Sequence, residues 1–185
     1  MKKYELTEET VTVYGKTLYR IRAVRDFGSV KTGEFGGYIE KEENLSHFGN
    51  AWVSGNAWVF DNARVYDNAW VFGNAWVFDN ARVYDDAWVC GDAKVYGDAW
   101  VSGNAEVFNT RHFFVQGPIG SRNGFITFYR TKDNTVEVRC GCFSGSLQKF
   151  VDRVEETHGG SRYEKEYKLA AELAKVCIRL EGESR

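Results

Sequence analysis

The chain has 185 residues, of which 43% are hydrophobic and 27% charged, and this length allows one globular domain or two small ones. The formal net charge of -2 excludes a strongly basic nucleic-acid binder and an acidic disordered tail, and no apolar run approaches the roughly 18 residues of a membrane span. The N-terminus lacks the apolar core of a secretory signal and four cysteines do not make a disulfide framework, so we expect a cytoplasmic protein.

Residues 1–48 are predicted to form an N-terminal β cap. Residues 10–14 and 18–24 alternate between apolar and polar side chains, and Gly15-Lys16 between them is a hairpin signal. The repeats that follow would expose unpaired strand edges at both ends, so a cap is physically required.

From Gly49 to Phe108 the chain reads as ten six-residue units with the consensus Gly/Asp, Asn/Asp, Ala, any, Val, any. In each unit the Ala and Val share one side of a short strand, and the two residues before them favour a sharp turn. Gly or Asp in every unit excludes a helix. Units two and five are identical, as are units three and six, so a second period, three units long, places three strands in each coil of a triangular prism.

This pattern resembles the left-handed parallel β-helix of hexapeptide-repeat proteins, which implies a mainly β fold with the helix over residues 49–109. The segment before the repeats, with Asp26-Phe27, Gly36-Gly37-Tyr38-Ile39-Glu40 and Glu43-Asn44-Leu45-Ser46, looks like the YdcK-like hexapeptide-repeat proteins of bacteria and phages. The resemblance implies a fold and brings no reaction with it.

The outward residues of the prism form ladders one coil apart, and two faces carry mainly aromatic rings. An exposed apolar area of this size is uncommon on a monomer, so we expect a homo-oligomer, with a trimer favoured by the three faces. The predicted interface residues are Trp52, Trp58, Trp70, Trp76, Trp88, Phe60, Phe72 and Phe78. Cover by the chain's own termini is the alternative, and a stacking surface for bases or sugars is another. The repeats carry seven Asp and one Glu against three basic residues, which argues against nucleic acid as a partner.

Residues 110–185 are predicted to be an α+β domain that closes the other end of the prism. Strands are expected over residues 112–116, 125–131 and 135–140, and helices over residues 147–157 and from Ser161 onward, where a capping-box pattern begins. The region resembles a segment of phage and prophage proteins through residues 117–133, 140–143 and 156–160. The resemblance implies that this domain is the working part and the β-helix its multimerising stalk.

A glycine-rich loop over residues 117–123 could hold an anion through backbone N–H groups and a guanidinium. It lacks the lysine and the following helix of a P-loop, so nucleotide hydrolysis is not expected, and a plain strand-connecting loop is the alternative. The predicted ligand-binding residues are Gly120, Ser121, Arg122, Asn123 and His158.

Cys140 and Cys142 with His158 could be metal ligands or a catalytic cysteine with its base. The CxC spacing is unusual for zinc and a fourth ligand is missing, so we expect no metal, no cofactor and no catalytic residue. Hexapeptide-repeat acyltransferases use a histidine base between subunits. Here His47, His112 and His158 all lie outside the regular repeats.

The sequence therefore predicts a non-enzymatic oligomeric binding protein of phage or prophage type. Its partner would be a host protein or a small anionic ligand, with no membrane involved. The phage association suggests action against a host defence system. Two alternatives remain: sequestration of a small anionic nucleotide signal, and acyl transfer by a hexapeptide-repeat enzyme.

Overall fold

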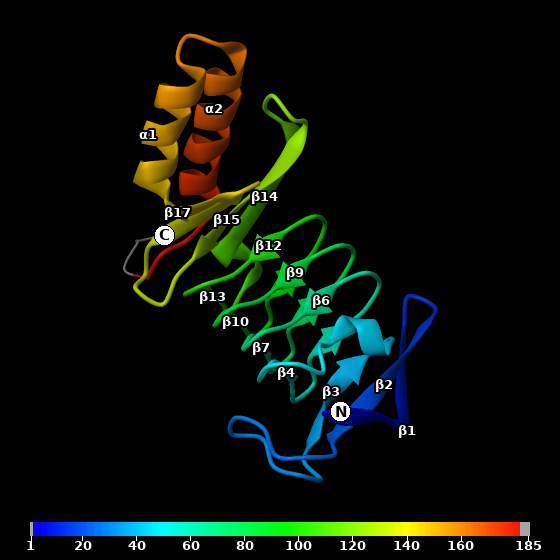
Figure 1. Cartoon of the computed structure of the whole chain (residues 1–185). Coiled ribbons are helices and arrows are strands. Elements are labelled where there is room, and N and C mark those ends of the chain that lie inside the picture. Colours follow the sequence, from blue (N-terminus) through cyan, green and yellow to red (C-terminus); the bar gives the residue numbers. More distant parts are fainter. Residues whose placement is uncertain (1, 182–185) are drawn as a thin grey trace.

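The computed structural model describes residues 2–181, and Figure 1 shows three parts in chain order along one long axis: an N-terminal β region, a prism of stacked coils and an α+β domain. None of the described helices is long and apolar enough to cross a membrane.

The prism consists of two-residue strands that pair in parallel across coils. Each strand pairs with the equivalent strand of the next coil, three units further along the chain, as in the pairs Trp58 with Trp76 and Arg64 with Arg82. The first face is the sheet β13-β10-β7-β4, the second continues along β5-β8-β11, and the third is β12-β9-β6. The predicted coils of three strands are confirmed. The strands are β4 (Trp52–Val53), β5 (Trp58–Val59), β6 (Arg64–Val65), β7 (Trp70–Val71), β8 (Trp76–Val77), β9 (Arg82–Val83), β10 (Trp88–Val89), β11 (Lys94–Val95), β12 (Trp100–Val101) and β13 (Glu106–Val107).

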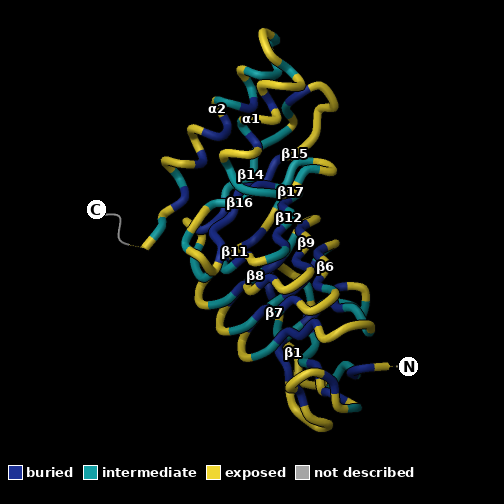
Figure 2. The backbone as a smooth tube through the Cα atoms, turned by 60° about the vertical axis from the view of Figure 1, so that its left-hand side comes forward, coloured by how far each residue is buried: buried dark blue, intermediate teal, exposed yellow. Residues whose placement is uncertain are grey.

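The interior of the prism is a column of Ala and Val side chains from every unit, all of them buried. Small inward residues are required because three strands close around a narrow space. At the corners the chain turns from one face to the next through left-handed residues such as Asp61 (φ 60°) and Gly73 (φ 73°). In Figure 2 exposed backbone recurs at these corners while buried segments follow the interior.

The N-terminal region is an antiparallel hairpin joined to the prism. β1 (Tyr4–Val13) and β2 (Lys16–Ala23) meet at Tyr14 and Gly15, so the predicted hairpin is confirmed with its turn one residue earlier. β3 (Phe35–Ile39) pairs with β2 on one side and runs parallel to β5 on the other. Close packing requires glycine at Gly36, where a Cβ atom would lie 2.6 Å from the Val53 carbonyl oxygen.

The stacked coils begin at β3, before the regular repeats. After β3 comes the 3-10 helix η1 (Glu42–Asn44), and Leu45 then forms a parallel bridge with Val65 on the third face. The boundary predicted at residue 48 therefore falls inside the first coil. This coil is longer than the later ones, because Tyr38 pairs with Trp58 whereas Trp58 pairs with Trp76. The extra length is why the six-residue pattern does not extend back to β3.

The N-terminal region covers part of the aromatic surface. Phe60 is buried together with Val13 and Leu18 of the hairpin, and Trp52 is buried against Tyr4 and Phe27. Trp52 and Phe60, which were predicted at a subunit interface, are thus enclosed by their own chain. The other predicted interface aromatics are half-buried, except Trp88, which is 41% exposed.

The C-terminal domain is a four-stranded antiparallel sheet with two helices on one side. After η2 (Thr110–His112) come β14 (Phe113–Ile119), β15 (Gly124–Arg130), β16 (Val136–Cys140), β17 (Phe143–Ser146), α1 (Leu147–His158) and α2 (Arg162–Cys177). The prediction missed β17, because its sequence Phe-Ser-Gly-Ser is short and mostly polar. Ser161 caps α2 by accepting a hydrogen bond from the Glu164 amide, as its sequence predicts.

Alternation along β15 fixes how this domain sits on the prism. Ile126 and Phe128 point toward the helices, while Thr127 and Tyr129 point toward the last coil. The Trp100 amide donates to Thr127 Oγ1 at 2.9 Å, and the buried Arg130 pairs with Glu106 at 2.8 Å. The sheet therefore covers the open end of the prism.

Candidate ligand-binding groove

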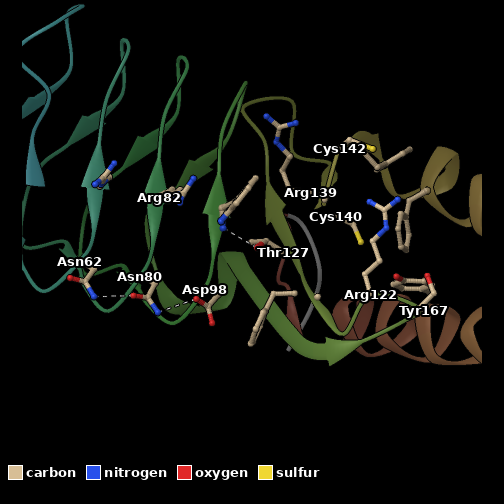
Figure 3. A pocket seen from close by; sticks show the side chains of 18 of the residues that line it. Asn62, Asn80, Arg82, Asp98, Arg122, Thr127, Arg139, Cys140, Cys142 and Tyr167 are labelled. Atoms are coloured by element: carbon tan, nitrogen blue, oxygen red, sulfur yellow. Dashed lines mark hydrogen bonds between the residues drawn. The ribbon is translucent and has the colours of Figure 1, made fainter. Parts of the chain in front are cut away.

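A groove of about 1330 Å³ runs along the third face of the prism, from η1 to the helices of the C-terminal domain. Figure 3 shows its polar corner, where Asn62 donates to Asn80 (3.2 Å) and Asn80 to Asp98 (3.0 Å). The groove exists because the outward residues of this face do not pack against the N-terminal hairpin.

The groove is positively charged although the whole chain is negative. Its lining holds six basic side chains and two acidic ones, a local charge of +4. The basic residues are Lys41, Arg64, Arg82, Arg122, Arg139 and Arg153, and the acidic ones are Glu43 and Asp98. Most carboxylates of the repeats lie elsewhere on the corners, so the average charge of the prism does not describe this face.

The prism contributes a ladder of three outward residues one coil apart. Arg64 and Arg82 are direct neighbours in the sheet, and Trp100 follows on the next strand. The Arg82 guanidinium lies 4.9 Å from the centre of the Trp100 ring. This contact holds the guanidinium in place while both arginine side chains remain exposed.

The C-terminal sheet supplies the next part of the wall. Arg139 on β16 is the register partner of Thr127 on β15, so both side chains point to the prism side. Arg139 Nε donates to Ser102 Oγ at 3.0 Å, and its guanidinium lies 5.2 Å from the Tyr84 ring. Phe125, two residues before Thr127 on the same strand, is 42% exposed and lines the groove.

Four guanidinium groups in this groove have no carboxylate partner in the described residues. Within residues 2–181, none of Arg64, Arg82, Arg122 and Arg139 forms an ion pair. Outside the groove, in the same range, some arginines are paired, such as Arg20 and Arg130, and others such as Arg111 are not. Arg153, which lines the groove from α1, pairs with Glu156 at 3.3 Å. Arginine is suited to planar, charge-assisted hydrogen bonds with phosphate or carboxylate, so the four groups can bind an anion.

The helix end of the groove combines a thiol, a phenol and an imidazole. Burial raises the pKa of the Cys140 thiol and raises the pKa of Tyr167 to about 12, so both groups stay protonated at neutral pH. The His158 ring lies 5.6 Å from the Tyr167 ring. Cys142 is exposed in the turn between β16 and β17, so the two cysteines do not lie on one strand.

Three of the five predicted ligand-binding residues line the groove: Ser121, Arg122 and His158. Gly120 does not, because its amide donates to Glu166 at 2.7 Å and a Cβ atom there would lie 1.9 Å from the Tyr167 hydroxyl. Asn123 closes a tight turn, with its amide bonded to the Gly120 carbonyl at 3.2 Å. Two amides of the loop, those of Gly120 and Asn123, are therefore engaged within the protein.

The sequence interpretation missed most of the groove residues, among them Arg64, Arg82, Trp100, Phe125 and Arg139. The three-unit period already places the first three in one ladder. The signal that could have found it is arginine at two equivalent positions, Arg64 and Arg82, where the other two faces carry mainly Trp. Phe125 and Arg139 become part of the groove only because the C-terminal sheet docks on the prism.

The other two histidines belong to the ends of the prism. His47 Nδ1 accepts from the Lys3 amide at 3.2 Å, and its ring stacks on Tyr4. Burial lowers the pKa of His112 to about 4, and its ring contacts Phe108. No three His, Cys, Asp or Glu side chains in the described residues are grouped as a metal site would need.

Comparison with known families gives one match. The family model described as YdcK Beta solenoid repeat matches residues 63–77 and 75–91, which span β6 to β10 in the middle of the prism. Among curated proteins, none matches the chain.

Proposed function

Since the chain is a YdcK-like β-solenoid protein, we propose that it is a non-enzymatic binding protein whose groove holds a phosphate-bearing ligand. One observation carries the proposal: four guanidinium groups without ion-pair partners in residues 2–181 line one groove of a chain whose net charge is -2. Surface ion pairs contribute little to stability, so the fold does not require carboxylate partners for these arginines, and donors without such partners are available for phosphate oxygens.

The groups in the groove favour binding over turnover. A thiol or phenol must ionise to act as a nucleophile, and burial raises the pKa of both Cys140 and Tyr167. The acyltransferase alternative needs a histidine base between subunits. His47 stacks on Tyr4 of the cap, His112 is buried against Phe108, and His158 lies at the end of α1, where its ring contacts Tyr167 of the same chain. The phage origin and the action against a host defence stay predictions from the resemblance of the sequence.

We also propose that copies of the chain associate through the uncovered part of the first face. A hollow of about 490 Å³ lies there among Ser29, Ser54, Trp70, Phe72 and Trp88. We expect Trp88→Ser to lower the molar mass measured by light scattering after size exclusion, with the exposed cap residue Phe48→Ser as the control. A wild-type chain that is already monomeric would contradict this part of the proposal.

The binding function is tested by calorimetric titration of the whole chain with ATP and with inorganic pyrophosphate. We expect at least one of them to bind, and the double variant Arg64→Ala with Arg82→Ala to weaken binding by about tenfold or more. Arg111→Ala, an exposed arginine outside the groove, is the control and should bind as the wild type does. Phosphorus NMR of the mixture should show ATP unchanged.

Absence of binding by both compounds, or equal binding by the double variant, would overturn the proposal. Cleavage of ATP that the double variant abolishes would overturn its non-enzymatic part.

A further inference from the structure

The ligand class can be narrowed from the size of the groove and the order of its groups. Ligand pockets of about 300 to 1,000 Å³ are usual for one small molecule. The groove, at about 1330 Å³, is larger and extends over both the prism and the C-terminal domain. A ligand that used all of it would be longer than one nucleotide.

Positive groups lie at both ends of the groove. Arg64 and Arg82 stand on the prism, one coil apart, which corresponds to about 4.8 Å between neighbouring strands. Arg122 and Arg153 lie on the β14–β15 turn and α1, and Arg139 lies between the two ends. A compact anion such as a single phosphate would reach one end only, so the spacing fits a ligand with several separate charges.

Aromatic rings lie between these two ends. Trp100 is the last rung of the third-face ladder, with Arg82 packed on it from the preceding coil. In the described part of the chain no further coil follows it on this face, and its amide is bonded to Thr127 instead. Phe125 shares the side of β15 on which Thr127 lies. The half-buried indole and the exposed phenyl ring thus offer stacking area where prism and domain meet, and base stacking on such rings is tolerant of sequence.

Hydrogen-bonding side chains line the groove beside the charged and aromatic groups. The corner ladder of Asn62, Asn80 and Asp98 lines the groove beside the arginines, with the carboxylate of Asp98 at its end. Amide and carboxylate groups at this position can meet the polar edges of a base. Charges at the ends, rings between them and polar groups alongside match the chemistry of linked nucleotides. An acidic peptide would match the charges and leave the rings without a partner.

We infer that the groove binds a short oligonucleotide of two or more nucleotides, with a base stacked on Trp100 and Phe125 and phosphates on the flanking arginines. This inference rests on the proposed function. It adds that a base of the ligand stacks on two aromatic rings and that the ligand has at least two nucleotides. The repeats as a whole carry a negative net charge, which argues against nucleic acid as a partner. The lining of the groove, however, carries a positive net charge.

The test is a calorimetric titration of the whole chain with four kinds of probe. These are inorganic pyrophosphate, the nucleoside monophosphates AMP, GMP and UMP, the 5′-phosphorylated dinucleotides pApA, pGpG and pUpU, and tetraglutamate. We expect at least one dinucleotide to bind about tenfold more tightly than its mononucleotide and than pyrophosphate. Tetraglutamate should bind more weakly than that dinucleotide.

Two variants separate stacking from charge. We expect Trp100→Leu and Phe125→Ala each to weaken the dinucleotide by about fivefold or more, and Phe125→Ala to leave pyrophosphate binding unchanged. Phe48→Ala, an exposed phenylalanine in the cap, is the matched control and should change neither. Because Phe125 is 42% exposed, its variant should fold normally even if Trp100→Leu does not.

The outcomes are distinct. If pyrophosphate or a mononucleotide binds as tightly as every dinucleotide, or both ring variants bind the dinucleotide normally, this inference is wrong while the proposed function stands. If tetraglutamate binds more tightly than the dinucleotides, the groove takes an acidic peptide and the inference is wrong. If no phosphate compound binds at all, the proposed function fails together with it.

Discussion

The second and third faces of the prism share one backbone and differ in what covers them. Their strands pair in the same way, each with its equivalent in the next coil, and Val points inward in every unit. The second face carries Trp58, Phe60, Trp76 and Phe78 and is covered in part by the N-terminal hairpin. The third face carries Arg64, Arg82 and Trp100 and opens into the groove. The inward residues therefore fix the coil, while the outward residues decide separately for each face whether it packs or binds.

The packing of the hairpin on the second face can be tested at one aromatic ring that it covers. Phe60 is 1% exposed beneath the hairpin, and Phe78 stacks on it at 5.2 Å one coil further from the cap. We expect Phe60→Ala to lower the free energy of unfolding by about 3 to 5 kcal/mol and Phe78→Ala by about 1 kcal/mol. Urea unfolding followed by circular dichroism measures both. Equal losses for the two variants would show that the hairpin does not cover this face.

Whether the sequence predicts a feature of these faces depends on how far apart in the chain the contacting residues lie. The strands, the faces and the ladders follow from the six-residue unit and its three-unit period, which are local. The cover of Trp52 by Tyr4 and the bond between Trp100 and Thr127 join residues far apart in the chain, and no periodic pattern encodes them. For that reason the interface prediction included two enclosed aromatics, and the ligand site was assigned to the C-terminal domain alone.

The attachment of the cap should depend on pH through Lys3. Its side chain is fully buried, with Nζ bonded to the Ala51 carbonyl at 2.6 Å, and burial lowers its pKa from 10.5 to about 8. A buried base with a lowered pKa destabilises the fold while it is protonated, so stability rises as pH increases from about 8 to 10.5. At pH 7 the shift corresponds to about 3 kcal/mol.

The variant Lys3→Met isolates this effect. It also loses the bond to Ala51, so the informative quantity is how its difference from the wild type changes with pH. We expect the wild type to gain stability relative to Lys3→Met between pH 7 and pH 10, measured by urea unfolding at each pH. A difference that stays constant over this range would mean that Lys3 is not shifted and that the cap does not enclose it.

The third face can be given the chemistry of the second. Trp occupies the fourth position in many units, so Arg82→Trp places a residue that the coil already accepts. We expect an unfolding free energy within about 1 kcal/mol of the wild type and ATP binding weaker by about tenfold or more. Lys94→Trp makes the same change on the second face, where Lys94 packs on Trp76 at 4.4 Å, and should leave binding unchanged. If Arg82→Trp unfolds the chain, the outward residues are not independent of the coil.

The smallest effect concerns the corner ladders, which are alike in structure and differ in place. Asn80 Nδ2 donates to Asp98 Oδ1 at 3.0 Å beside the groove, and Asn74 Nδ2 donates to Asp92 Oδ1 at 3.1 Å on another corner. Changing either Asn to Asp sets two carboxylates against each other. We expect Asn80→Asp and Asn74→Asp each to cost about 0.5 to 1 kcal/mol of unfolding free energy, because like charges at equivalent corners of neighbouring coils repel.

Binding should separate the two variants although stability does not. Asn80→Asp adds a negative charge to the lining of the groove, so we expect ATP to bind about threefold more weakly at low salt and the difference to shrink as salt is added. Asn74→Asp adds the same charge outside the groove and should bind as the wild type does. If both variants weaken ATP equally, the ligand responds to the charge of the whole molecule, and the third face has no special role in binding it.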